Sequence, residues 1–170
     1  MPDSTRDQLA AIADLAAALD ERGVDYWLFG GWAVDFWVGD VTREHDDVDV
    51  AAWRHDYDAI KAVMVAAGWR HTPDADEPFA ARYRRRATLV EFTFVVTDSA
   101  GRVLLPMAEP PVLWWPEPFG DSRRELHGVS SRVVPLSALK AGKSVPREDP
   151  ADAAKDRADF DALGTVPDAG

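Results

Sequence analysis

The 170-residue sequence contains no cysteine. Disulfide frameworks, thiolate zinc sites and a cysteine nucleophile are therefore excluded. Any metal ion must be held by oxygen or imidazole groups. The four histidines, at positions 45, 55, 71 and 127, are too widely spaced to form a zinc-binding motif. The sequence therefore argues against a zinc enzyme.

Long apolar runs and two common catalytic motifs are also missing. No stretch approaches the ~18 apolar residues of a membrane span, and the N-terminus carries Asp3 and Asp7 in place of a basic region followed by an apolar core. We therefore expect a cytoplasmic protein with no membrane partner. The sequence has neither a Gly-x-x-x-x-Gly-Lys-Ser/Thr phosphate loop nor a Gly-x-Ser-x-Gly elbow, so P-loop NTPases and serine hydrolases find no support.

Positive charge is scarce, since 19 Lys and Arg residues stand against 30 Asp and Glu residues, for a net charge of −11. This balance makes nucleic acid an improbable partner and favours a cationic one. The arginine-rich segment 82–86 does not change that conclusion, because alternation along a strand divides its side chains between two faces. We assign these arginines to ion pairs.

The apolar content is sufficient for a folded core, at 46% of residues. We expect one domain over residues 1–170, with a core at about 5–135 and C-terminal helices at about 136–163. Residue periodicity and Gly and Pro positions predict a mixed sheet with helices packed on one side, an α+β or α/β architecture. The predicted helices are 5–22, 32–38, 56–67, 136–143 and 151–163; the predicted strands are 26–29, 47–51, 69–71, 79–86, 88–96 and a hairpin at 123–134; segment 106–119 is predicted as a surface loop.

The most informative segment contains two glycines and two aspartates. Asp47 and Asp49 lie two residues apart on a predicted strand, so their carboxylates project from one face and can share a hard divalent cation such as Mg²⁺. Gly30 and Gly31 lie where a strand passes into a helix, so backbone amides there can face phosphate groups. The sequence therefore predicts a triphosphate-binding turn beside a magnesium site.

A third carboxylate would complete such a site, and Glu91 is the candidate, since Val90 and Phe92 around it are apolar and β-prone. Glu91 could act as the general base for an attacking hydroxyl or bind a second metal ion, and we favour the general base. The alternative is an ordinary cross-strand ion pair with one of the arginines of segment 82–86.

Several other residues are candidates for supporting roles. Arg43 and His45, in the loop before the metal strand, could contact phosphate or brace the carboxylates, and Asp46 has the strand parity to face away from the metal. Lysine side chains could neutralise the triphosphate or lie on the solvated surface, the candidates being Lys140, Lys143 and Lys155.

Aromatic residues of the predicted loop could also take part. Trp114, Trp115 and Phe119 could stack on an adenine or line an acceptor pocket, or they could simply pack the loop.

The segment Phe29-Gly30-Gly31 followed by Asp47-Val48-Asp49-Val50 resembles the nucleotidyltransferase superfamily signature. The longer patterns at 30–35 and 42–49 are similar to the aminoglycoside 2''-adenylyltransferase family, with lincosamide nucleotidyltransferases as near relatives. The resemblance covers residues 20–100, and the helix at 149–163 resembles the closing helix of such enzymes more loosely.

This resemblance implies an α+β fold, with a nucleotidyltransferase-like mixed sheet, helices packed on it and short C-terminal helices. It also implies transfer of AMP from ATP to a hydroxyl of a small molecule, with Asp47 and Asp49 as magnesium ligands and Glu91 as the third carboxylate. A polycationic aminoglycoside would suit the acidic surface. Three alternatives stay open: a lincosamide acceptor, a toxin-type enzyme that modifies a protein or tRNA, and a relative that binds nucleotide without catalysis.

Overall fold

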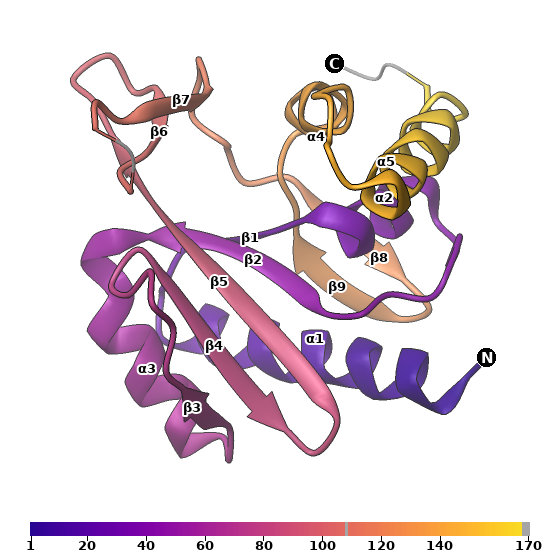
Figure 1. The fold of residues 1–170 in the computed structure, drawn as a ribbon. Coiled ribbons are helices and arrows are strands. Elements are labelled where there is room, and N and C mark those ends of the chain that lie inside the picture. The colour runs from indigo at the N-terminus through magenta and orange to yellow at the C-terminus, as the bar shows by residue number, and fades with distance from the viewer. Residues whose placement is uncertain (108, 168–170) are drawn as a thin grey trace.

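A mixed sheet forms the centre of the computed structural model, which describes residues 1–107 and 109–167 (Figure 1). The main strands follow the order β1-β2-β5-β4-β3. The neighbouring pair β2–β5 is parallel, and the neighbouring pairs β1–β2, β5–β4 and β4–β3 are antiparallel. The predicted α+β class is confirmed. The bounds of these strands are β1 Tyr26–Phe29, β2 Val48–Trp53, β3 Arg70–Thr72, β4 Ala80–Arg85 and β5 Thr88–Thr97.

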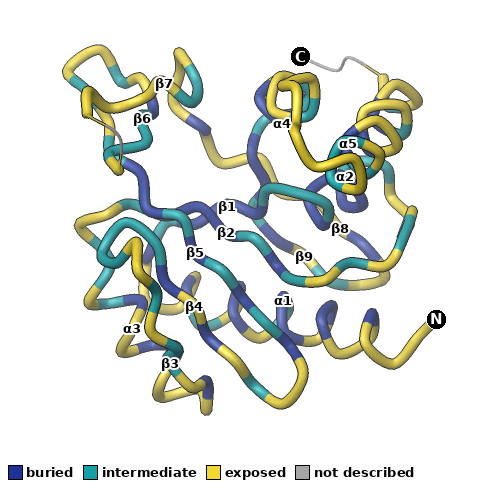
Figure 2. Tube along the Cα trace, viewed as in Figure 1, coloured by how far each residue is buried: buried dark blue, intermediate teal, exposed yellow. Residues whose placement is uncertain are grey.

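Two helices, α1 (Asp3–Glu21) and α3 (Tyr57–Ala66), cover one face of this sheet. The covered face is apolar because alternate strand residues point toward the helices, including Val90, Phe92 and Phe94 of β5. The predicted helical spacing of α1 is also confirmed, since Ile12, Leu15 and Leu19 are buried. In Figure 2, the β1 trace is largely buried and α1 alternates between buried and exposed residues. Along β5 the buried residues alternate with partly buried ones such as Glu91, which lie on the opposite face of the sheet.

The parallel pairing of β2 and β5 decides where the acidic residues lie. Its register places Asp49 opposite Glu91, while the antiparallel β1–β2 register places Asp49 opposite Phe29. Phe29 is the last residue of β1, and helix α2 (Gly30–Val38) follows at once, two residues earlier than predicted. The glycine pair is therefore the first turn of a helix beside the acidic strand.

The C-terminal half adds two hairpins and two helices. Strands β6 (Val103–Leu105) and β7 (Val112–Trp115) extend the sheet from β5, so the prediction of a surface loop at 106–119 is wrong in part. The reason is tertiary, because Trp114 packs edge-on against Phe29 and Phe119, with ring centroids 5.0 and 5.1 Å away.

The remaining elements bring the end of the chain to the acidic strand. Strands β8 (Arg123–Leu126) and β9 (Val129–Arg132) form the predicted hairpin, and α4 (Leu136–Lys143) and α5 (Pro150–Leu163) follow as predicted. Asp149 caps α5 by accepting hydrogen bonds from two backbone amides. Helices α4 and α5 pack against each other and against α2 (Figure 1). Within the described residues, no helix combines the length and apolar character needed to span a bilayer.

Candidate active site

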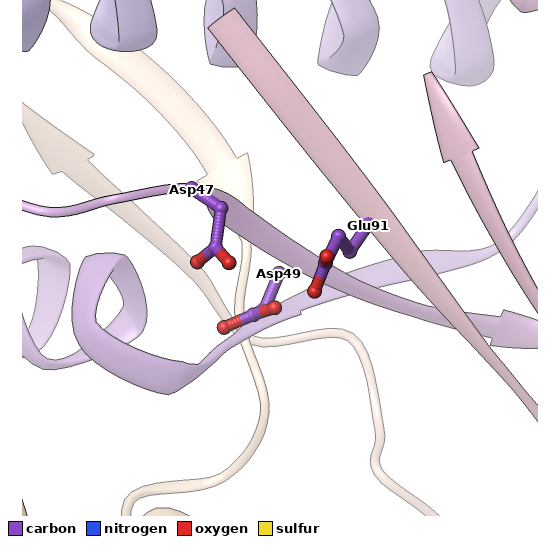
Figure 3. A group of neighbouring side chains, drawn as sticks. All are labelled: Asp47, Asp49 and Glu91. Atoms are coloured by element: carbon purple, nitrogen blue, oxygen red, sulfur yellow. The ribbon is translucent and has the colours of Figure 1, made fainter. Parts of the chain in front are cut away.

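Three carboxylates converge on the open face of the sheet. Asp47 immediately precedes β2, Asp49 lies on β2 and Glu91 lies on β5, and their side chains point toward one another (Figure 3). One oxygen from each lies within 4.8 Å of the others. The convergence follows from the two-residue strand period and from the β2–β5 register.

Burial and neighbouring carboxylates raise the pKa values of all three groups. Burial raises the pKa of Asp49 to about 7, and the charges of Asp47 and Glu91 add to the shift. Burial also raises the pKa of Asp47 and of Glu91, with further increases from Asp46 and Asp47 respectively. Three half-buried oxygen ligands whose negative charges repel one another are what a hard divalent cation stabilises, so the residues fit a magnesium ion.

Glu91 also makes the cross-strand ion pair considered from the sequence. Nε of Arg82 lies 3.1 Å from Glu91 Oε1 and 3.1 Å from Asp74 Oδ2. Arg82 opposes the rise in the pKa of Glu91 that burial and Asp47 cause. The ion pair and the carboxylate cluster therefore coexist, and they do not exclude each other. The assignment of the arginine run to ion pairs also holds for Arg85, which contacts Asp14 at 2.8 Å.

Gly30 leaves room for the carboxylate of Asp49 to lie against the turn. Gly30 has φ +69°, and a Cβ atom at this position would lie 2.5 Å from Asp49 Oδ2. Only glycine combines that backbone conformation with such close approach of a side chain. The glycine turn and the acidic pair are therefore in direct contact.

Gly31 is required for a different reason from the one expected. A Cβ atom there would meet the ring of His45 and lie 2.7 Å from Arg43 Nη2. The space beside Gly31 is filled by the protein's own side chains, so this glycine lets the loop before β2 pack against the first turn of α2.

His45 has the contacts of a bracing residue. Its Nε2 lies 2.5 Å from Oδ2 of the fully buried Asp35, and its ring packs against Trp32. The side chain of Gln8 donates to the His45 carbonyl oxygen at 2.9 Å and accepts from Trp32 Nε1 at 2.8 Å. Of the two roles considered for His45, bracing of the carboxylate loop therefore matches its contacts.

The three carboxylates and both glycines line a polar cavity of about 300 Å³. Of the cationic candidates from the sequence, Arg43, Lys143 and Lys155 lie at its wall, whereas Lys140 is outside the lining of this cavity. Lys155 donates to Asp46 at 2.8 Å, and both residues line this cavity, but Asp46 is not part of the carboxylate cluster.

A second cavity of about 260 Å³ adjoins the first and is more apolar. Phe29, Trp114, Val134 and Leu139 line it, together with Asp49. Of the three aromatic candidates of segment 106–119, Trp114 alone reaches this cavity, while Phe119 is buried beneath it at 1% exposure.

Four residues around these cavities were not assigned a role in the site from the sequence. Arg147 lines both cavities, Asp35 holds His45, and Asp156 and Asp159 hold cations of the cavity wall. A signal existed for α5, because residues 152, 156 and 159 are aspartates at helical spacing on one face. Asp35 was also visible as an acidic residue within the apolar helix α2.

The family model for aminoglycoside-2''-adenylyltransferase matches residues 11–163. The chain belongs to the aminoglycoside-2''-adenylyltransferase family. A 2''-aminoglycoside nucleotidyltransferase of Klebsiella pneumoniae is 38% identical over 74 residues, and one of Escherichia coli is 36% identical over the same length. These segments amount to 44% of this chain and 42% of either relative, so less than half of each relative is matched.

Two solved structures share the fold of this chain over nearly its whole length. The lincosamide antibiotic adenylyltransferase LnuA, with lincomycin bound, has a TM-score of 0.71 at 17% identity and covers 95% of this chain and 97% of its own. ANT(2")-Ia, in complex with adenylyl-2"-tobramycin, has a TM-score of 0.63 at 20% identity, with 94% and 88% coverage. At these identities the likeness establishes the fold alone.

Replacing Gly30 should perturb the site beyond the strain of its backbone. Gly39→Ala is the matched control, because Gly39 has φ +86° with nothing within 4 Å of a Cβ atom. We expect Gly39→Ala to cost about 1–2 kcal/mol of the free energy of unfolding, and Gly30→Ala about 1–3 kcal/mol more because Asp49 must move. Urea denaturation measures both, and equal losses would show that Asp49 yields freely.

Asp49 should make the protein less stable as pH rises when divalent cations are absent. Its folded pKa of about 7 exceeds the unfolded value of ~3.9. The folded state therefore binds more protons between these values, and this contribution to stability is lost from about pH 4 to pH 7. In EDTA at pH 8, Asp49→Asn should raise Tm by about 2–4 °C, which is roughly 1 kcal/mol at this chain length. A lower Tm than wild type would contradict the raised pKa, and the exposed Asp161→Asn serves as control.

Proposed function

We propose that this protein is a magnesium-dependent nucleotidyltransferase that transfers AMP from ATP to a hydroxyl group of an aminoglycoside. The observation that carries the proposal is the carboxylate cluster of Asp47, Asp49 and Glu91 in contact with the Gly30 turn, where a polar and an apolar cavity meet. Membership of the adenylyltransferase family supports the same reaction.

Asp47 and Asp49 are the proposed magnesium ligands. Burial raises the pKa of both carboxylates, and neighbouring carboxylates raise it further. When bound, Mg²⁺ supplies positive charge that neutralises phosphate oxygens and stabilises the leaving pyrophosphate. Gly30 keeps the Asp49 carboxylate in place beside the first turn of α2.

The two cavities suit the two ends of ATP. The polar cavity has Arg43, Lys143, Arg147 and Lys155 at its wall, and the N-terminus of α2 opens there, which suits the triphosphate. In the apolar cavity, the aromatic ring of Trp114 lies beside aliphatic side chains, and this lining suits a nucleobase. Asp49 lines both cavities and thus lies at the junction between them.

Glu91 is the proposed general base. The acceptor hydroxyl oxygen attacks the α-phosphorus of ATP and forms a new P–O bond, while the bond from the α-phosphorus to the bridging oxygen breaks and pyrophosphate leaves. The hydroxyl proton passes to the Glu91 carboxylate, whose pKa is raised by burial and by Asp47 and so favours holding that proton. Arg82 and the strand register hold Glu91 beside the metal ligands.

The net charge of the chain and the named relatives support an aminoglycoside as the acceptor. The net charge of −11 attracts a polycation over distance, and the relatives at 36–38% identity are 2''-aminoglycoside nucleotidyltransferases. A lincosamide is the second candidate acceptor, because the likeness to lincomycin-bound LnuA has the higher TM-score, 0.71 against 0.63.

Pyrophosphate release tests the reaction and the acceptor together. The protein is incubated with ATP, Mg²⁺ and, in separate reactions, aminoglycosides, lincosamides, tRNA or a protein extract. We expect release that depends on an aminoglycoside and stops in EDTA, with a mass increase of the drug by one AMP. Release with a lincosamide alone would replace the acceptor, and nucleotide binding without any release would overturn the proposed catalysis.

Glu91→Gln should separate proton transfer from nucleotide binding. The amide keeps the shape of the side chain but cannot accept the proton, so we expect kcat to fall by about 10²–10⁴-fold. The dissociation constant of ATP with Mg²⁺ should change by less than about threefold, because Asp47 and Asp49 are retained. The exposed Glu125→Gln is the control, and a Glu91→Gln enzyme with normal kcat would remove the general-base role.

A further inference from the structure

The C-terminal helix α5 presents a row of aspartates to the candidate site. Asp152 and Asp156 line the polar cavity, and Asp159, one turn further along, lies deeper at 1% exposure. A carboxylate this deeply buried is costly unless cations and hydrogen bonds compensate it. Asp159 is not among the residues that line either cavity, so its contacts must be with other protein groups.

Asp159 binds two cations of the cavity wall. Arg43 donates through Nε to Oδ1 at 3.0 Å and through Nη2 to Oδ2 at 3.0 Å, a bidentate pair. Nζ of Lys143 lies 2.8 Å from the same Oδ2. Burial raises the pKa of Asp159, but the hydrogen bonds from Arg43 and Lys143 outweigh it and hold that pKa below its usual value.

These contacts join three separate parts of the chain. Arg43 precedes the metal strand, and its guanidinium packs against Gly31; Lys143 ends α4; and Asp159 lies on α5, 116 residues after Arg43. Nζ of Lys143 also lies 3.3 Å from Asp156 Oδ1, so the two cations are balanced by two carboxylates. Both cations are therefore already ordered before a phosphate binds.

We propose that Asp159 is a positioning residue for the nucleotide, which fixes Arg43 and Lys143 at the wall of the polar cavity so that both cations meet the triphosphate in a defined geometry. The inference rests on the proposed function. Immobilising long side chains such as Lys and Arg costs rotamer entropy. Asp159 meets this cost during folding, so ATP need not meet it on binding.

The charge of Asp159 gives an opposite expectation if it acts only as a counter-ion. Removing a negative charge beside two cations makes the cavity more positive and would then tighten ATP binding. Loss of positioning weakens binding in spite of the added positive charge. Asp159→Asn therefore distinguishes the two roles by the sign of its effect.

The experiment measures ATP binding in the presence of Mg²⁺ by titration calorimetry, together with steady-state kinetics. For Asp159→Asn we expect the dissociation constant and KM of ATP to rise about tenfold or more, with the KM of the acceptor unchanged within twofold. Asp161→Asn, an exposed aspartate two residues further along α5, is the matched control and should behave like wild type. Unchanged or tighter ATP binding by Asp159→Asn would overturn the positioning role.

A second variant keeps the test decisive if Asp159→Asn folds poorly. Arg43→Lys retains the charge of a residue whose side chain is 24% exposed, but it loses the bidentate fork to Asp159. We expect Arg43→Lys to weaken ATP binding about five- to tenfold, and wild-type affinity in this variant would overturn the inference.

The wild-type protein separates the two proposals. If the wild type binds ATP and releases pyrophosphate while both variants match it, only the inference fails. A wild type that does not bind ATP refutes the proposed function itself.

Discussion

The parallel pairing of β2 and β5 is the constraint on which the site depends. It places Asp49 beside Glu91, and the two-residue strand period adds Asp47, so three like charges meet with oxygens within 4.8 Å of one another. Such repulsion destabilises the fold unless protons or a cation relieve it. Burial is the largest cause of the raised pKa of each carboxylate, and neighbouring negative charges raise each pKa further. A site that stores negative charge in this way is suited to hold a metal ion that is bound with a nucleotide.

The rest of the structure restrains the loop that precedes the acidic strand β2. On one side, the buried Asp35 holds His45, and on the other, the buried Asp159 holds Arg43, so the loop before β2 is fixed by carboxylates from two different helices. Between these anchors, Gly31 gives room for both side chains. The loop is therefore preorganised by groups that lie behind the cavity wall.

The family relationship and the geometry answer different questions. The match over residues 11–163 establishes the family, and the solved structures establish the fold over nearly the whole chain. Neither says how the cavity wall of this chain is organised. That comes from the contacts of α4 and α5, where Lys143, Asp156 and Asp159 form a charged layer between the helices and the glycine turn.

The sequence by itself determined the local elements and the acidic pair, because alternation, helical spacing and glycine positions are short-range signals. It pointed to Asp47, Asp49 and Glu91 and named Arg43, His45, Lys143 and Lys155 as supporting candidates. Only the tertiary structure decided that β7 forms within segment 106–119 and that Asp159 pairs with Arg43. The physical reason is sequence separation: a contact across 116 residues is set by how helices and sheet pack, and no local periodicity encodes it.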